Sequence, residues 1–147
     1  MLPGIDYVGI TVGFACHDGQ GNFLLHKRSQ HCRDQRGVWD WGGGKMESGE
    51  TIREAVLREV KEEYGCQGEI QVALPAHDWI TTIAGKKAFW VSLGHIVKVN
   101  RDEVKNGDPH SIDEISWFKL DNLPQPLHPA VKYKLENFRE YFKPFEK

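Results

Sequence analysis

The pattern of hydrophobic and polar residues predicts strands and helices in an α/β arrangement. Residues 7–16 and 23–27 are rich in β-branched and aromatic side chains and flank a polar turn at 17–22, which predicts a β-hairpin. A short apolar run at residues 38–41 follows a polar loop, and the glycines after it are expected to break any regular element. Further strands are predicted at residues 70–79, 88–97 and 115–120.

Two segments have the periodicity of amphipathic helices. Thr51 and Glu54 are spaced as a capping box before the first helix, and Gly65 is a favourable residue just after its end. The expected buried stripe of this helix consists of Ile52, Ala55, Val56, Leu57, Val60 and Tyr64. The second helix is predicted at residues 131–142, with an apolar side of Val131, Leu135, Phe138, Tyr141 and Phe142. The order β-β-β-α-β-β-β-α predicts a mixed sheet with helices packed on it.

Length and charge are those of one globular domain. The chain has 147 residues, of which 27% are charged, and a formal net charge of −2. We therefore expect one domain over residues 1–147, and the lack of a basic excess argues against a nucleic-acid polymer as partner. No apolar stretch approaches the ~18 residues of a membrane span, and no signal peptide is evident, so a cytoplasmic location is expected. Three cysteines without C-x-x-C spacing favour free thiols.

The most informative segment for function is a glycine-rich turn followed by a helix with clustered carboxylates. Glu59, Glu62 and Glu63 are related by i+3 and i+4 spacing, which places them on one side of the helix. Like charges at this spacing repel each other, and hard oxygen ligands suit Mg²⁺ or Mn²⁺, so the group is a candidate site for either ion. The alternative is a solvated acidic face in which Arg58 pairs with Glu62 at i+4.

Residues 44–66 resemble the Nudix box, G-x5-E-x7-R-E-U-x-E-E-x-G-U with U a bulky aliphatic residue, of the Nudix (MutT-like) hydrolases. Two differences from the family pattern are Cys66 at the last U position and Gly42 where many members have proline. The specified positions are filled by Gly44, Glu50, Arg58, Glu59, Val60, Glu62, Glu63 and Gly65.

The resemblance implies an α/β/α sandwich and Mg²⁺-dependent hydrolysis of a nucleoside diphosphate linked to another moiety. It implies that Glu59, Glu62 and Glu63 ligate the metal, helped by the backbone carbonyl of Gly43. It also implies that Arg58 orients a carboxylate and that Glu50 anchors the loop to the helix. A divalent ion would neutralise phosphate oxygens and lower the pKa of bound water, which then attacks phosphorus.

Other parts of the site stay open at the level of sequence. The general base is Glu62 or Glu63, or a carboxylate outside the box, for which Asp113 and Glu114 are the candidates. Phosphate contacts are expected from Arg28 and Lys45. One of the five tryptophans could stack on a base, whereas His26, His31 and His77 have no partner at ligand spacing and favour packing or surface roles.

The resemblance and elimination of substrate signatures favour a (modified) nucleoside triphosphate, cleaved to monophosphate and pyrophosphate. The alternatives are hydrolysis of ADP-ribose or another nucleotide sugar, isomerisation of isopentenyl diphosphate, and a non-catalytic nucleotide sensor. Residues 24–29 also resemble the isomerases, but their Cys-rich motif is absent and the box here is intact. The expected partner is a small nucleotide, and a homodimer is an open alternative.

Overall fold

A computed structural model describes all residues, 1–147, and confirms an α/β fold with a mixed sheet and two helices. The eight strands form one sheet with the central order β3-β2-β1-β7-β5, while β4, β6 and β8 pair with β1, β7 and β2. Only β1 and β7 pair in parallel, and the other pairs are antiparallel. The strands are β1 Gly9–His17, β2 Phe23–Arg28, β3 Trp39–Asp40, β4 Gly42–Lys45, β5 Gly68–Ala73, β6 His77–Ile83, β7 Lys86–Val99 and β8 Ile112–Phe118.

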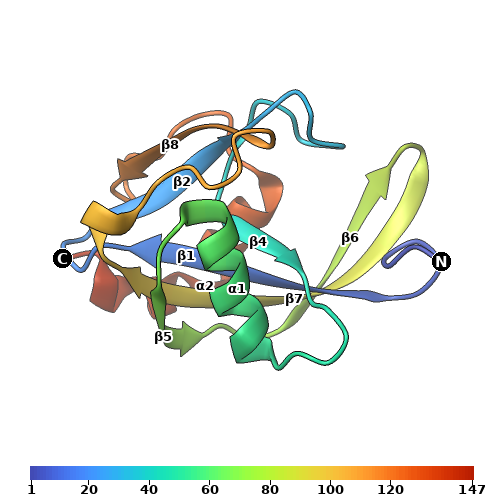
Figure 1. The fold of residues 1–147 in the computed structure, drawn as a ribbon, viewed down its shortest axis with the longest axis horizontal. Helices are drawn as coiled ribbons and strands as arrows, with labels where there is room; N and C mark the ends of the chain where they lie inside the picture. The colour runs from blue at the N-terminus through green and yellow to red at the C-terminus, as the bar shows by residue number, and fades with distance from the viewer.

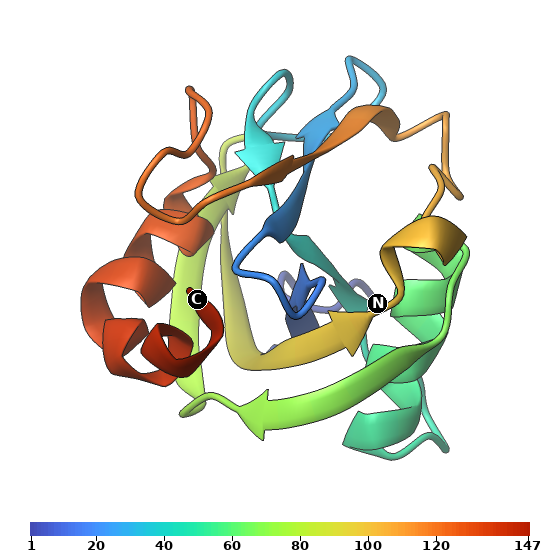
Figure 2. The same cartoon turned by 90° about the vertical axis from the view of Figure 1, so that its left-hand side faces the viewer.

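The two helices cover opposite sides of the curved sheet (Figures 1 and 2). Helix α1 spans Ile52–Tyr64 and α2 spans Pro129–Phe142, with short 3-10 helices at Arg101–Glu103 and Lys143–Phe145. Neither helix is long and apolar enough to cross a membrane. The layers form the expected sandwich, and its core is divided into one apolar cluster under each helix.

Strand β1 contributes to both clusters because successive side chains of a strand point to opposite faces. Val12 and Phe14 belong to the cluster under α1, whereas Ala15 belongs to the cluster under α2. The α1 cluster also contains Val56, Val60 and Tyr64, and the α2 cluster contains Val131 and Phe142. The face predicted for α1 is therefore buried for most of its length. In α2, Val131 and Phe142 are buried, whereas Tyr141, predicted on the apolar side, is 43% exposed.

The ends of α1 follow the sequence signals. Thr51 and Glu54 form the reciprocal capping box, and Gly65 adopts the left-handed conformation with φ 65° just after the helix. One position of the predicted stripe is wrong. Ile52 is 43% exposed, because all residues of the first turn, 52–54, lie beyond the edge of the packed surface.

The sequence predicted that the three glycines at residues 42–44 break any regular element. This prediction is wrong, because they form strand β4 against β1. A Cβ atom at Gly42 would collide with the ring of Phe14, and one at Gly43 would lie 2.8 Å from the carbonyl oxygen of Val12. Glycine is needed here for close approach to β1 rather than for a turn.

The long strand predicted at residues 70–79 is also wrong, because the structure has two strands there. Strands β5 and β6 both pair with β7, and residues 74–76 separate them. Pro75 has no N–H for a ladder hydrogen bond, and Leu74 turns into the α2 cluster. Strand β6 pairs with the first half of β7, where it contributes to one wall of the cleft described below.

Candidate active site

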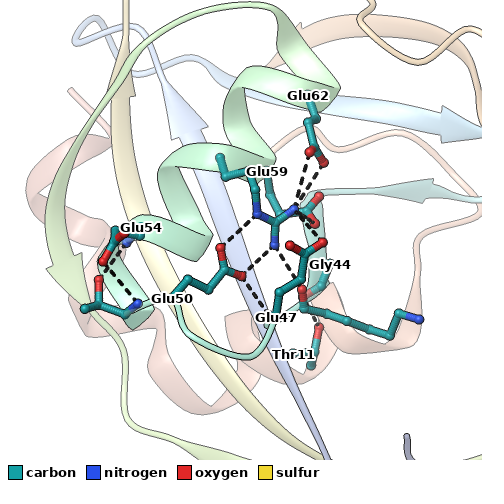
Figure 3. A network of polar contacts seen from close by, with 10 residues as sticks. Thr11, Gly44, Glu47, Glu50, Glu54, Glu59 and Glu62 are labelled. Atoms are coloured by element: carbon teal, nitrogen blue, oxygen red, sulfur yellow. Dashed lines mark hydrogen bonds and ion pairs between the residues drawn. The ribbon is translucent and has the colours of Figure 1, made fainter. Parts of the chain in front are cut away.

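The guanidinium of Arg58 holds the segment before α1 against the helix. Its carboxylate partners Glu50, Glu59 and Glu62 are labelled in Figure 3. Its Nε and Nη2 donate to the two carboxylate oxygens of Glu50 at 2.9 and 2.7 Å, a paired contact of the strong, charge-assisted kind. Nη2 also donates to the carbonyl of Lys45 at 3.2 Å. The hydrogen bonds from Arg58 lower the pKa of Glu50 to about 2, so Glu50 is ionised at neutral pH.

The remaining nitrogen of Arg58 contacts two of the predicted metal ligands. Nη1 donates to Glu59 Oε1 at 2.9 Å and approaches Glu62 Oε2 at 3.3 Å. The Glu59 side chain is 13% exposed and that of Glu62 is 59% exposed. Arg58 therefore contacts Glu59 and Glu62 as well as Glu50, and the i+4 pair with Glu62 is the one expected for an acidic helix face.

Strand β4 brings backbone atoms close to two other carboxylate oxygens. The N–H of Gly43 donates to Glu63 Oε2 at 3.0 Å. A Cβ atom at Gly44 would overlap the carboxylate of Glu59, and one at Gly42 would lie 2.7 Å from Glu63 Oε2. The glycines of β4 thus leave room for both carboxylates against the strand.

Both of these carboxyl groups have a raised pKa. Burial is the main cause for Glu63, and the charge of Glu59 adds to it, while the N–H of Gly43 opposes it. Burial is also the main cause for Glu59, and the bond from Arg58 opposes it. A cation beside them would favour the ionised forms, because opposite charge lowers the pKa of a carboxyl group.

The three predicted metal-binding carboxylates do not meet at one point in this structure. No group of three or more His, Cys, Asp or Glu side chains lies close enough to hold a metal ion. Glu62 points to solvent beside Arg58, whereas Glu59 and Glu63 lie against β4. Spacing along the helix predicts which residues are neighbours, but not the side-chain torsions that set the carboxylate positions.

A cleft of about 550 Å³ opens next to β4. It is bounded by parts of β1, β4, β6, β7 and the start of α2. Glu59, Glu62, Arg58, Glu50 and Gly65 are not in its lining. The predicted site residues that line it are Arg28, Gly43, Gly44, Lys45 and Glu63.

Arg28 and Lys45 both line the cleft but differ in their ion pairs. Arg28 Nη2 pairs with Asp34 Oδ1 at 3.0 Å, and its Nη1 lies 3.7 Å from Asp40. Lys45 is exposed at the end of β4. The charge of Arg28 is largely matched within the protein, so Lys45 is the more available cation.

The structure does not bring the two carboxylates outside the box to this site. Glu114 lies on β8 opposite Lys27 of β2, where it is exposed and outside the cleft lining. Asp113 is its exposed neighbour. Neither carboxylate lines the cleft, so a general base from this strand stays a prediction.

The family model described as "NUDIX domain" matches residues 8–139, which covers the sheet, α1 and most of α2. The chain belongs to the NUDIX family. The resemblance expected from residues 44–66 is confirmed.

Relatives and solved structures agree with this family. "Nudix hydrolase 3" of Caenorhabditis elegans is 36% identical over 89% of this chain and 57% of its own length. "8-oxo-dGDP phosphatase NUDT18" of Homo sapiens is 34% identical over 71% of this chain and 30% of its own length. The chain thus spans less than two thirds of either relative. The crystal structure of a MutT NUDIX hydrolase from Burkholderia pseudomallei has a TM-score of 0.77 and 32% identity, over 88% of this chain and 97% of that one.

Two further residues of this NUDIX domain line the cleft, and sequence reasoning gave neither of them a place there. The expected packing role of His26 is confirmed, since it is buried and shares a 2.7 Å hydrogen bond with the hydroxyl of Tyr64, and it also lines the cleft. Lys134 is only 7% exposed and also lines the cleft. One signal for Lys134 was available, since it is three residues after Val131 and so falls on the buried side of α2.

Proposed function

We propose that this NUDIX domain hydrolyses a phosphoanhydride bond of a nucleotide with the help of a divalent cation, Mg²⁺ or Mn²⁺. The observation that carries the proposal is the placement of Glu59 and Glu63. Both carboxylates lie against the glycines of β4, one of them in the lining of the cleft, and both have a pKa raised by burial. Buried oxygen ligands of this kind fit a hard cation.

In this proposal Glu59, Glu62, Glu63 and the backbone carbonyl of Gly43 hold the cation. The cation supplies charge neutralisation at phosphate oxygens and a lowered pKa for bound water. A rotation of Glu62 away from Arg58 would bring the third carboxylate in, and this costs little because the Glu62–Arg58 contact is long and exposed. Arg58 positions Glu59, and Glu50 fixes Arg58 in turn.

The proposed reaction is hydrolysis of a (modified) nucleoside triphosphate to monophosphate and pyrophosphate. The oxygen of water forms a bond to phosphorus, the bond to the bridging oxygen breaks, and pyrophosphate leaves. The proton of the water passes to a carboxylate oxygen of Glu62 or Glu63, of which Glu63 lines the cleft. Arg28 and Lys45 line the cleft and would contact the phosphates.

The placement of the cysteines argues against the isoprenoid isomerase alternative. Cys16 and Cys66 are buried under α1, and Cys32 donates to the carbonyl of Ser111 at 3.3 Å. None of them lines the cleft. The human relative is named for a nucleotide phosphatase activity, which supports a nucleotide over an isoprenoid here.

A substrate panel tests this proposal. The purified protein is incubated with nucleoside triphosphates, ADP-ribose, a nucleotide sugar and isopentenyl diphosphate, and products are identified by mass. We expect monophosphate and pyrophosphate from triphosphates, loss of turnover in EDTA and recovery with Mg²⁺ or Mn²⁺. Undiminished turnover in chelator contradicts the metal requirement, and AMP plus ribose phosphate as the main products favours the ADP-ribose alternative.

A further inference from the structure

A lysine is buried on the α2 side of the cleft, away from the carboxylates of α1. Lys134 Nζ donates to Ser92 Oγ at 3.2 Å, and Lys134 forms no salt bridge. An ammonium group has three donors and no acceptor, so two of its donors have no partner within the protein. Burial lowers its pKa, and the charge of Asp40 opposes this shift. A buried cation without an anionic partner is costly, which points to a partner from outside the chain.

A second donor in the same cleft is also without a partner. The indole Nε1 of Trp41 is buried and forms no hydrogen bond. The residue is 5% exposed, lines the cleft with Lys134, and stacks on Phe142 with ring centroids 5.2 Å apart. Buried donors in folded proteins almost always have an acceptor, and an indole N–H can only donate.

The floor between the two ends of the cleft is made of glycine. Gly43, Gly13 and Gly94 are cross-strand neighbours on β4, β1 and β7. Adjacent strands lie about 4.8 Å apart, so Gly43 and Gly94 are ~10 Å apart. Glu63 is bonded to Gly43 at one end of this row, and the side chain of Lys134 lies over Gly94 at the other. A Cβ atom at Gly13 would contact only the Gly42 carbonyl, at 3.7 Å.

Three tryptophans are also part of the cleft lining: Trp79 of β6, Trp90 of β7 and Trp41. Aromatic side chains and a glycine floor suit a planar ring, because both offer flat surfaces without polar groups that need partners. The α2 end of the cleft therefore fits a nucleobase better than a further phosphate.

We propose that Lys134 and the indole N–H of Trp41 bind a carbonyl oxygen of the nucleobase, so that the cleft selects oxopurine nucleotides over adenine nucleotides. This inference rests on the proposed function. Guanine and hypoxanthine present acceptors at O6 and N7, whereas adenine presents an amino donor at position 6. The ammonium of Lys134 and the indole N–H of Trp41 can only donate, so they match the acceptor O6 of guanine or hypoxanthine. With adenine they would face an amino group, which is itself a donor.

The test compares inosine triphosphate (ITP) with ATP. At position 6 of the base, ITP has a carbonyl group where ATP has an amino group. The wild-type protein should have the higher kcat/KM for ITP, and Lys134→Met should lower the ITP-to-ATP ratio by ~10-fold or more, the size of a lost hydrogen bond to a charged group. Trp41→Phe should act in the same direction. Lys132→Met is the matched control, because Lys132 is exposed on the same helix. An unchanged ratio in the Lys134 variant, or an equal fall for both substrates, overturns the inference.

Binding separates this inference from the proposed activity. Quenching of tryptophan fluorescence by IMP and AMP needs neither a metal ion nor turnover. We expect tighter binding of IMP and loss of this preference in Lys134→Met. If no triphosphate is hydrolysed while the IMP preference depends on Lys134, the proposed function fails and the inference stands. Equal binding of IMP and AMP by the wild-type protein overturns the inference even where hydrolysis is observed.

Discussion

The two sides of the sheet bury apolar clusters of equal size, but they differ in whether their charged side chains have ionic partners. Each cluster contains 11 buried residues. On the α1 side, Arg58 contacts Glu50, Glu59 and Glu62, so each of these three carboxylates has a cationic neighbour within the chain. On the α2 side, Lys134 is buried with a hydroxyl as its hydrogen-bond acceptor.

The two sides therefore offer different groups to a ligand: positioned carboxylates on the α1 side, and hydrogen-bond donors without partners on the α2 side. The α1 network sets Glu50 and Glu59 in place through charge-assisted hydrogen bonds from Arg58. The α2 end leaves donors uncompensated, so any ligand with an acceptor there relieves a cost that the free protein carries. We therefore expect changes on the α1 side to affect rate and changes at Lys134 to affect which base is selected.

The largest effect is expected from Glu63→Gln. The variant keeps the shape of the side chain and an acceptor for the N–H of Gly43, so the protein should fold. Loss of the charge should lower kcat/KM by ~10²–10⁴, the usual range for a positioned acid–base group. Glu62→Gln should show a loss in the same range if its carboxylate joins the site.

The matched control is Glu136→Gln, at an exposed position of α2. Activity is measured on the best substrate of the panel, and folding by circular dichroism. Near-wild-type rates for both box variants would mean that the carboxylates of α1 are structural and would favour the nucleotide-sensor alternative.

A change deep in the α2 cluster should affect stability but not chemistry. Phe23 is fully buried, contacts Phe142 with ring centroids 5.9 Å apart, and does not line the cleft. Phe23→Ala should lower the free energy of unfolding by ~3–5 kcal/mol, as for other buried aromatic residues. Urea denaturation measures this loss, and kcat/KM per folded molecule should stay within about 2-fold of wild type. A rate loss as large as that of Glu63→Gln would mean that the two sides are not separable.

Acid should weaken the contact between β2 and α1 through His26. Burial is the main cause that lowers the pKa of His26 to about 4, against ~6.5 in an unfolded chain. Since the unfolded state binds the proton more readily, stability from this group is complete above pH ~6.5 and is lost as pH falls towards 4. Between pH 7 and 5 the expected loss is about 2 kcal/mol.

Urea denaturation at the two pH values measures this effect. The pH dependence should be smaller in His26→Gln by that amount and unchanged in His110→Gln, where the histidine is exposed. Equal pH dependence in wild type and His26→Gln would mean that His26 does not stay neutral in the folded protein.

The α1 side could be predicted from sequence because its residues are close along the chain. The capping box, the position of Gly65 and the i+4 contact of Arg58 with Glu62 all follow from spacing along one helix. The cleft could not be predicted in this way. Trp41, Lys134 and Ser92 come from different elements, and only the paired sheet brings them together.

The errors have physical reasons of the same kind. The glycines of β4 were interpreted by their local flexibility, but contact with Phe14 and Val12 decides their conformation. The break at residues 74–76 had a local signal in Pro75, whereas the entry of Leu74 into the α2 cluster depends on tertiary packing. Glu114 stays a prediction as general base, and the pairing of β8 with β2 leaves it outside the cleft lining.

The smallest effect is expected at Ile52, which tests how far helix periodicity predicts burial on the α1 side. Ile52 and Val56 fall on the same predicted stripe, yet Ile52 is 43% exposed and Val56 is fully buried. Ile52→Gln should therefore change the free energy of unfolding by less than ~0.5 kcal/mol, as for most surface substitutions. Val56→Ala should lower it by ~1–3 kcal/mol, because methyl groups are lost from a packed core. Urea denaturation of both variants measures the difference. Equal losses would mean that Ile52 packs against the sheet and that the periodic pattern was correct over the whole helix.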